Sequence, residues 1–209
     1  MKYLAIDLGN VVCRVNFDAF KKLLSKILNI GMDEAEYFLV KTQRLHDIGL
    51  TNVADELQNN FNIKSPALIE ELLAEWNLTI QSEAAMIEML DLLVHSKHTD
   101  QVEIALLSNI GPEHAGIVPG LLTWRIYDKC IKFFSYEVGA RKPSYLYYKT
   151  FLDMHPEFKG CIYVDDRLEN IKTGRQFGLN SVHFELDSFH SYEDLAVGIE
   201  KLKQLIYSA

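Results

Sequence analysis

The stretch Tyr3-Leu4-Ala5-Ile6-Asp7-Leu8-Gly9-Asn10-Val11-Val12 decides how the rest of the chain is interpreted. It is an apolar run of strand-forming residues that ends on a single carboxylate, and a Gly-Asn turn follows at once. Buried strands of parallel sheets are continuous apolar runs, and ligands bind beyond their carboxyl ends. Asp7 therefore stands where an α/β sheet places its chemistry, although an Asp after a strand also caps turns in many proteins.

The composition restricts the classes of protein to consider. The chain has 209 residues, 48% of them hydrophobic, which is enough for a sizeable core and a second small lobe. It carries 29 acidic and 21 basic residues, and its formal net charge of -8 argues against non-specific binding to nucleic acid or to an anionic membrane surface. A phosphorylated substrate stays open, because a few local cations and a metal can outweigh a distant acidic surface.

The cysteines and the amino terminus favour a cytoplasmic protein. Cys13, Cys130 and Cys161 are scattered and odd in number, which fits buried thiols in a reducing compartment better than a disulfide framework. Asp7 interrupts the first apolar run, so no signal peptide is expected. No apolar run has the length of a membrane-spanning helix.

Two regimes of secondary structure follow the opening strand. Residues 16–79 carry helical periodicity and no strand signal, and a Ser65-Pro66 start marks one of the predicted helices. From Ser82 onward, predicted helices alternate with strands, which implies a parallel sheet built of right-handed crossovers. The predicted strands are residues 102–107, 131–134, 161–164 and 181–184.

The opening strand has only this downstream sheet to join, so the helical block is an insertion. We therefore predict an α/β fold, a Rossmann-like three-layer sandwich with a central parallel sheet and an inserted α-helical cap domain. The core takes residues 1–15 and 81–209, and the cap takes residues 16–80. We expect the cap to cover the carboxyl ends of the strands.

Three predicted strands end on polar groups that would meet at one edge of the sheet. Carboxylates there could hold Mg²⁺ through oxygen ligands, while a hydroxyl, backbone N–H groups and a lysine hold the remaining oxygens of a phosphoryl group. Each group alone has an ordinary explanation, such as a turn cap, a solvated cation or a helix N-cap. The groups are Asp7, Ser108-Asn109, Asp165-Asp166 and the lysine of Gly139-Ala140-Arg141-Lys142-Pro143.

This ordered set closely resembles the motifs of the haloacid dehalogenase-like (HAD) hydrolase superfamily. The resemblance covers nearly the whole chain, including a helical cap inserted after the first strand. The matching segments are residues 6–11, 106–109, 139–143 and 164–171. The resemblance implies that Asp7 is the nucleophile forming an aspartyl-phosphate, that Ser108 and the Asn109 backbone amide bind phosphate oxygens, and that Lys142 orients Asp7 and the phosphate.

The same resemblance implies Mg²⁺ as the cofactor. Its implied ligands are Asp7, the Gly9 carbonyl and Asp166, with Asp165 as a ligand directly or through water. The finer resemblance, in Asp-Leu-Gly-Asn-Val, Ser-Asn and Arg-Lys-Pro, is to the branch that contains bacterial α-glucose-1-phosphate phosphatases.

Gly9 departs from the pattern of the family's phosphatases. These usually carry a second Asp two residues after the nucleophile, as acid for the leaving group and base for water, and a positioned proton donor is typically worth about 10²–10⁴-fold in rate. Three explanations stay open. The leaving group needs little help, as in an anomeric sugar phosphate or an acyl phosphate; a cap residue such as His46 supplies the proton; or the protein binds without turnover.

We expect a Mg²⁺-dependent phosphatase that acts on a small phosphorylated metabolite, a sugar phosphate, as a monomer or homodimer. The alternatives are a catalytically impaired phosphate-binding or interaction protein and a metal-independent 2-haloacid dehalogenase. Adjacent Asp165 and Asp166 look like a metal pair and favour phosphate.

Cap residues near the Gly49 turn are where we expect substrate selectivity, although each also fits an ordinary polar helix face. These residues are Gln43, Arg44, His46 and Asp47. The remaining histidines, His114 among them, are expected at the surface.

Overall fold

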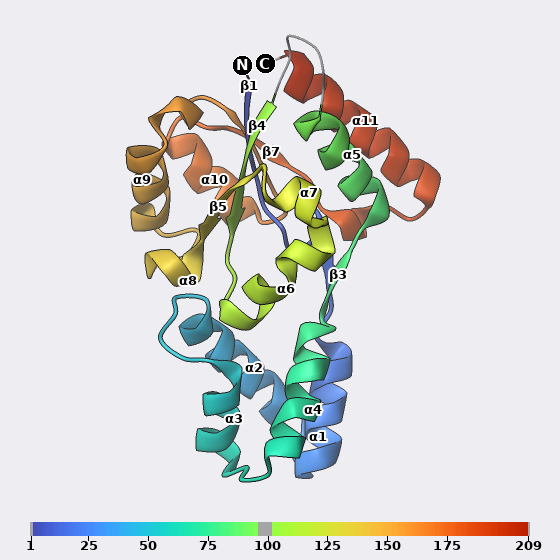
Figure 1. Ribbon diagram of the computed structural model, residues 1–209, viewed down its shortest axis with the longest axis vertical. Helices are drawn as coiled ribbons and strands as arrows, with labels where there is room; N and C mark the ends of the chain where they lie inside the picture. The colour runs from blue at the N-terminus through green and yellow to red at the C-terminus, as the bar shows by residue number, and fades with distance from the viewer. Residues whose placement is uncertain (1, 96–101, 209) are drawn as a thin grey trace.

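The centre of the protein is a five-stranded parallel sheet in the order β5-β4-β1-β6-β7 (Figure 1). The structure, a computed structural model, describes residues 2–95 and 102–208, so residues 1, 96–101 and 209 of the predicted core lie outside the description. The strands are β1 (Lys2–Ile6), β4 (Val102–Ser108), β5 (Ile131–Phe134), β6 (Ile162–Asp165) and β7 (Asn180–His183). Helices cover both faces of the sheet, which confirms the predicted α/β sandwich.

Successive strand residues enter two different hydrophobic cores, because side chains alternate between the faces of a sheet. Leu4 and Ile6 of β1 pack on one face, and Ala5 packs on the other. The first face is covered by α5 (Ala84–Val94), α6 (Pro112–Leu122), α7 (Trp124–Tyr127) and α11 (Tyr192–Ser208). The second face is covered by α9 (Tyr145–Met154), η1 (Pro156–Phe158) and α10 (Leu168–Gln176).

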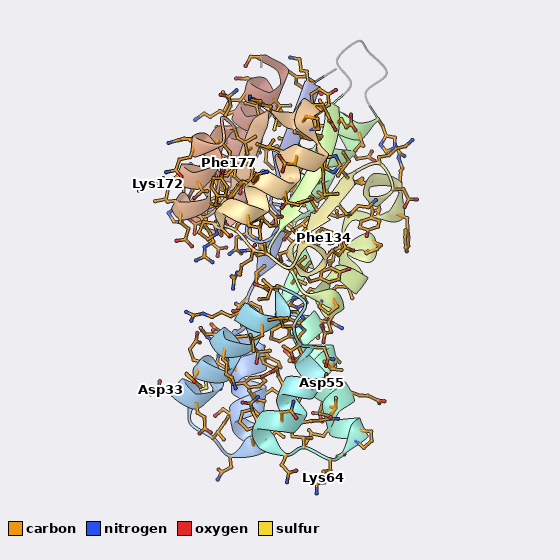
Figure 2. The ribbon with its side chains drawn as sticks, turned by 90° about the vertical axis from the view of Figure 1, so that its left-hand side faces the viewer. Asp33, Asp55, Lys64, Phe134, Lys172 and Phe177 are labelled. Atoms are coloured by element: carbon orange, nitrogen blue, oxygen red, sulfur yellow. The ribbon has the colours of Figure 1, made fainter. Side chains whose placement is uncertain are left out.

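Four helices form a separate lobe below the sheet: α1 (Asp18–Leu28), α2 (Met32–His46), α3 (Val53–Phe61) and α4 (Pro66–Asn77). The lobe has its own hydrophobic core around Phe20, Leu72 and Trp76. Figure 2 shows Asp33, Asp55 and Lys64 in this lobe, well separated from Phe177 in the sheet domain. Two of its helices have side-chain N-caps: Asn52 accepts a hydrogen bond from the backbone N–H of Asp55 at 2.8 Å, and Ser65 accepts one from that of Leu68 at 3.4 Å.

A two-stranded antiparallel ribbon connects the lobe to the sheet domain. It pairs β2 (Cys13–Val15) with β3 (Ile80–Ser82). The sequence analysis predicts no strand at β3, because three residues are too few to show a periodic pattern. The sequence also leaves α6 unrecognised, since Pro119 and neighbouring glycines interrupt its pattern, yet the helix runs through them.

The remaining short elements are α8 (Ser135–Val138) and η2 (Leu186–Ser188). All three cysteines are buried and unbridged. Within the described ranges, no helix is both long and apolar enough to cross a bilayer.

Candidate active site

Asp7 lies directly after β1 at the carboxyl edge of the sheet. Its backbone N–H donates to the carbonyl of Val164 at 2.9 Å, which continues the pairing of β1 with β6. The register brings Ser108 at the end of β4 to one side of Asp7 and Asp165 at the end of β6 to the other. These strands occupy the middle of the sheet, where the chain order changes direction and ligands of open α/β sheets bind.

Lys142 is a buried cation between two carboxylates. Its Nζ lies 3.0 Å from Oδ2 of Asp7 and 2.6 Å from Oδ2 of Asp165. It also donates to the carbonyl of Leu107 at 2.6 Å, so all three ammonium protons have an acceptor. Burial alone would lower the pKa of Lys142, but Asp165 and Asp7 raise it above its usual value, and the side chain stays charged.

Asp165 accepts hydrogen bonds at both carboxylate oxygens. Oδ2 accepts from Lys142 and from the hydroxyl of Tyr163 at 2.5 Å. Oδ1 accepts from the backbone N–H of Arg167 at 2.9 Å and from Nδ2 of Asn170 at 2.8 Å. Burial would raise the pKa of Asp165, but Lys142 and these donors hold it below its usual range, so the group is ionised.

The carboxylates of Asp7, Asp165 and Asp166 each offer an oxygen, and these oxygens lie within 4.8 Å of one another. Burial, together with the charges of Asp165 and Asp166, raises the pKa of Asp7 to about 7 despite Lys142. Burial and Asp165 also raise the pKa of Asp166. A cluster of oxygen donors whose negative charges are only partly compensated suits a hard divalent cation such as Mg²⁺.

The loop after β4 is fastened to the Lys142 segment by a side-chain amide. Asn109 donates from Nδ2 to the carbonyl of Lys142 at 2.9 Å, and its Oδ1 accepts from the Lys142 backbone N–H at 2.7 Å. Ser135, which the sequence did not single out, accepts from the N–H of Ile110 at 2.9 Å and so supports the same loop. Ser135 could have been found from its position directly after the strand β5, at the same edge of the sheet as Asp7 and Ser108.

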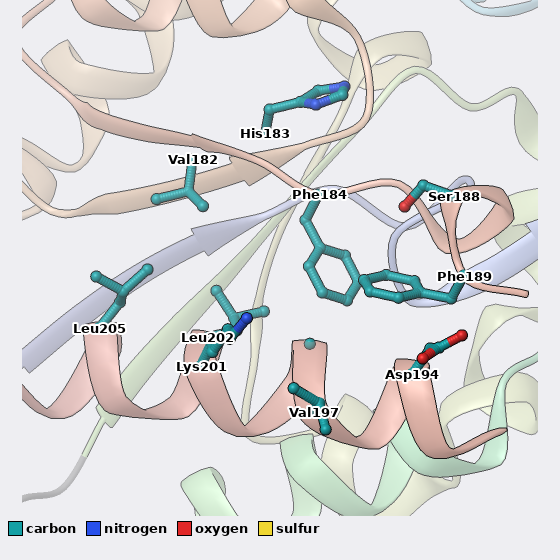
Figure 3. A pocket seen from close by; sticks show the side chains of 11 residues that line it. Val182, His183, Phe184, Ser188, Phe189, Asp194, Val197, Lys201, Leu202 and Leu205 are labelled. Carbon is teal, nitrogen blue, oxygen red and sulfur yellow. The ribbon is translucent and has the colours of Figure 1, made fainter. Parts of the chain in front are cut away.

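A cavity of about 170 Å³ lies between the carboxyl edge of the sheet and the helical lobe. Its lining residues are Asp7, Gly9, Asn10, Val15, Gln43, Asp47, Ser108, Asn109, Arg141, Asp166, Arg167 and Asn170. A larger cavity, about 500 Å³, lies between β7 and α11, where Figure 3 shows Phe184 and Phe189 side by side. That cavity is mainly apolar and shares no residue with the carboxylate cluster, whereas Asp7 and Asp166 line the smaller cavity.

The lobe residues proposed for selectivity reach different places. Asp47 lines the cavity, and its Oδ2 lies 3.3 Å from a guanidinium nitrogen of Arg141. Gln43 also lines the cavity. Arg44 is exposed and His46 is only 1% exposed, and neither is among the residues that line this cavity.

The prediction that His114 lies at the surface is wrong. His114 is buried, and its ring stacks on Trp76 with a centroid distance of 5.0 Å and an interplanar angle of 7°. Its Nε2 lies 2.9 Å from the carbonyl oxygen of Trp76 and 3.2 Å from Oγ1 of Thr79. Burial lowers the pKa of His114 to about 4. The error follows from missing α6, which packs this residue against the helical lobe.

Solved structures with a similar arrangement identify the fold. A HAD-family enzyme from Bacteroides thetaiotaomicron, solved in complex with magnesium and inorganic phosphate, matches with a TM-score of 0.74 and 20% identity over 92% of this chain and 98% of that chain. A predicted HAD-like family hydrolase from Porphyromonas gingivalis matches with a TM-score of 0.72 and 16% identity over 97% of each chain. This is the fold of HAD-family enzymes.

More distant matches within the HAD fold include L-2-haloacid dehalogenase from Xanthobacter autotrophicus, with a TM-score of 0.58 and 12% identity over 96% of this chain and 83% of that chain. No known family's sequence profile matches the chain. One curated protein, a drimenol cyclase from Aspergillus calidoustus, is 32% identical over 80 residues, which is 37% of this chain and 15% of that protein. The chain therefore corresponds to a small part of that relative.

Proposed function

We propose that the protein is a Mg²⁺-dependent HAD-type phosphatase that hydrolyses a small phosphorylated metabolite. The observation that carries the proposal is the buried ammonium of Lys142, 3.0 Å from Asp7 and 2.6 Å from Asp165, beside the further carboxylate of Asp166. This arrangement presents one carboxylate to an incoming phosphoryl group and keeps a fixed positive charge next to it.

In the proposed reaction, an Asp7 carboxylate oxygen attacks phosphorus, and the bond to the substrate's bridging oxygen breaks. That oxygen leaves with the bonding electrons and gains a proton from water. A water molecule then attacks the phosphorus of the aspartyl-phosphate, which releases inorganic phosphate and regenerates Asp7. The Ser108 hydroxyl and the Asn109 N–H would hold the non-bridging oxygens during both steps, with the positive charge of Lys142 beside them.

The donor set fits Mg²⁺, which when bound would neutralise the repulsion between an anionic substrate and the carboxylates. Asp7, Asp166 and the Gly9 carbonyl are the proposed ligands, with Asp165 close to them. The structure with magnesium and phosphate from Bacteroides thetaiotaomicron supports this assignment by analogy of fold.

The finer proposal is that the substrate is a sugar phosphate and that residues 16–80 act as a cap over it. Gln43, Asp47 and Arg141 line the cavity with amide, carboxylate and guanidinium groups, which are suited to hydroxyl groups of a sugar. The α-glucose-1-phosphate phosphatase branch is the proposed relative. The three unbridged cysteines support a cytoplasmic location.

Replacing Asp7 by Asn tests the function. We expect the purified protein to release phosphate from members of a panel of phosphorylated metabolites in the presence of Mg²⁺ and to lose this activity when EDTA is added. Asp7→Asn should abolish release while circular dichroism and the melting temperature remain those of a folded protein. Full activity in the Asp7→Asn protein would refute the proposal. Metabolite binding without any phosphate release would favour the binding protein, and EDTA-resistant halide release from a 2-haloacid would favour the dehalogenase.

A further inference from the structure

Asp165 has no free position for a metal while its hydrogen bonds are in place. A carboxylate has about four acceptor positions. Those of Asp165 face four donors, namely the Lys142 ammonium, the Tyr163 hydroxyl, the Arg167 N–H and the Asn170 amide. Asp7 and Asp166 are less occupied: Asp7 accepts from Leu8 and Lys142, and Asp166 has only Asn10 at 3.5 Å among its side-chain contacts.

Tyr163 is the donor to Asp165 that belongs to no motif of the proposed site. It precedes Asp165 by two residues on β6, and its hydroxyl approaches Oδ2 to 2.5 Å. Its side chain is completely buried in the core that contains α9. Gly174 of α10 packs directly on the ring, since a Cβ there would lie 2.7 Å from a Tyr163 ring carbon. The ring and its hydroxyl therefore have little room to move.

Tyr148 lies directly behind this contact. Its hydroxyl lies 3.2 Å from that of Tyr163 and 3.1 Å from the carbonyl oxygen of Asn170, and Asn170 in turn donates to Asp165. Each hydroxyl has one proton: Tyr163 donates its proton to Asp165, and Tyr148 donates its proton to the carbonyl oxygen of Asn170. Tyr148 therefore supports the site through Asn170 and through the packing of its ring on that of Tyr163. Three side chains, Tyr163 from β6, Tyr148 from α9 and Asn170 from α10, thus help to fix one carboxylate.

We propose that Tyr163, supported by Tyr148, is a positioning residue that holds Asp165 on Lys142 and leaves the cation to Asp7 and Asp166. The geometry gives the carboxylates different roles. Asp165 orients the ammonium that faces Asp7, and the less occupied carboxylates point to the cavity, which Asp165 does not line. This proposal rests on the proposed function for its catalytic consequence, but its consequence for metal binding does not need turnover.

The test is Tyr163→Phe, which removes one oxygen and keeps the ring. Without the hydroxyl, Oδ2 of Asp165 regains an acceptor position and can turn toward the cation. We expect kcat on an aryl phosphate to fall about tenfold or more, with KM within twofold, because a charge-assisted hydrogen bond that orients Lys142 is lost. We expect the Kd for Mg²⁺, measured by calorimetry on the metal-free protein, to fall about threefold or more.

Tyr145→Phe is the matched control, because Tyr145 lies on the same helix as Tyr148 but is 68% exposed. It should change neither measurement. Tyr148→Phe should shift both in the same directions as Tyr163→Phe but less, and it carries the test if Tyr163→Phe does not fold. An unchanged Kd for Mg²⁺ in the folded variant would overturn the proposal. So would a parallel loss of kcat, Mg²⁺ affinity and melting temperature, which is the signature of a purely structural role. If the wild-type protein hydrolyses nothing, the calorimetric comparison still decides the positioning role.

Discussion

Nε2 of His46 lies 2.6 Å from Oε2 of Glu113, and this contact joins the helical lobe to the sheet domain. The other oxygen of Glu113 accepts from the backbone N–H of Val53 at 2.7 Å, so one carboxylate holds the ends of α2 and α3. The imidazole packs against Gly111, where a Cβ would lie 2.0 Å from it. Burial opposes the charge on His46, but Asp47 and Glu113 raise its pKa above the usual value. The position of Asp47 in the cavity depends on this junction.

Glu113→Ala should loosen the lobe and weaken substrate binding. The change leaves His46 and the Val53 N–H without their acceptor, at a cost of about 1–3 kcal/mol in the free energy of unfolding. We expect KM to rise more than kcat falls, because the residues that we propose to react lie on the sheet domain. Urea unfolding and steady-state kinetics measure the two effects. Glu88→Ala, at an exposed position on α5, is the control and should change neither the free energy of unfolding nor KM. An unchanged KM in Glu113→Ala would show that the contact between Glu113 and His46 does not position the lobe.

Lys142→Met should be severely damaging because it leaves the three carboxylates without their buried cation. Removing one partner of a buried ion pair typically costs about 3–5 kcal/mol, and we expect a loss of that size in urea unfolding of the metal-free protein at pH 8. Mg²⁺ should recover part of it, since the cation supplies the missing charge. Activity should fall below detection. Lys172→Met, at an exposed position on α10, is the control, and equal stability of the two variants would contradict the buried ion pair.

The edge of the sheet was predictable because its signals are local. Asp7, Ser108 and Asp165 each follow an apolar strand-forming run, and parallel strands bring such positions together. Lys142 was predictable from its motif, but its complete burial was not, since burial depends on how the loop docks between β4 and β6.

The other features of the site depend on contacts between distant segments, and such contacts leave no periodic pattern in the sequence. Glu113 contacts His46 because α6 packs against the lobe, and the sequence around either residue gives no sign of the contact. Tyr163 looks like an ordinary strand residue in an apolar run. Its role as a donor becomes visible only when the pleat places it on the same face as Asp165, two residues along β6.

His114 should make the protein sensitive to acid. Its pKa is about 4 in the folded state against 6.5 in the unfolded chain, so the unfolded state binds the proton more tightly. The stability contributed by neutral His114 is present above pH 6.5 and is lost as the pH falls toward 4. We expect the free energy of unfolding of the wild-type protein minus that of His114→Gln to fall by about 2 kcal/mol between pH 7.5 and pH 5, measured by urea unfolding.

The free energies of unfolding of the wild-type protein and of His114→Gln must be compared, because Asp7 changes stability with pH in the opposite direction to His114. The pKa of Asp7 is raised to about 7, so its contribution to stability is present at low pH and is lost as the pH rises from 4 to 7. Asp7 is present in both proteins, as are the groups near the imidazole, His46, Asp47 and Glu113. Their contributions to the pH dependence of the free energy of unfolding therefore cancel in the difference. A difference that is independent of pH would mean that His114 takes up its proton without resistance from burial.

Gly9 should make the rate depend on the leaving group. Without a side-chain acid at this position, the departing oxygen must carry its negative charge unaided. An anomeric oxygen carries it better than a primary alkoxide, because the ring oxygen withdraws charge. We therefore expect kcat/KM to be clearly higher for sugar 1-phosphates, acyl phosphates and aryl phosphates than for hexose 6-phosphates. His46 lies outside the lining of the cavity and is held by Glu113, so His46→Ala should leave this ratio unchanged.

Gly9→Asp should reduce the difference in kcat/KM between sugar 1-phosphates and hexose 6-phosphates, because it supplies the missing proton donor. A Cβ at Gly9 meets only Cγ2 of Val15, at an ordinary 3.4 Å, and the position lines the cavity beside Asp7, so a carboxyl group can enter it. We expect the rate on hexose 6-phosphates to rise about tenfold or more, within the usual range for a positioned acid, while the rate on aryl phosphates changes little. Gly9→Asn, which has the same shape but no acidic proton, should not reproduce the gain. Equal rates on 1-phosphates and 6-phosphates in the wild-type protein would refute this account of Gly9. A gain with Gly9→Asn as large as with Gly9→Asp would locate the effect in substrate binding, because only the carboxyl group can deliver a proton to the leaving oxygen.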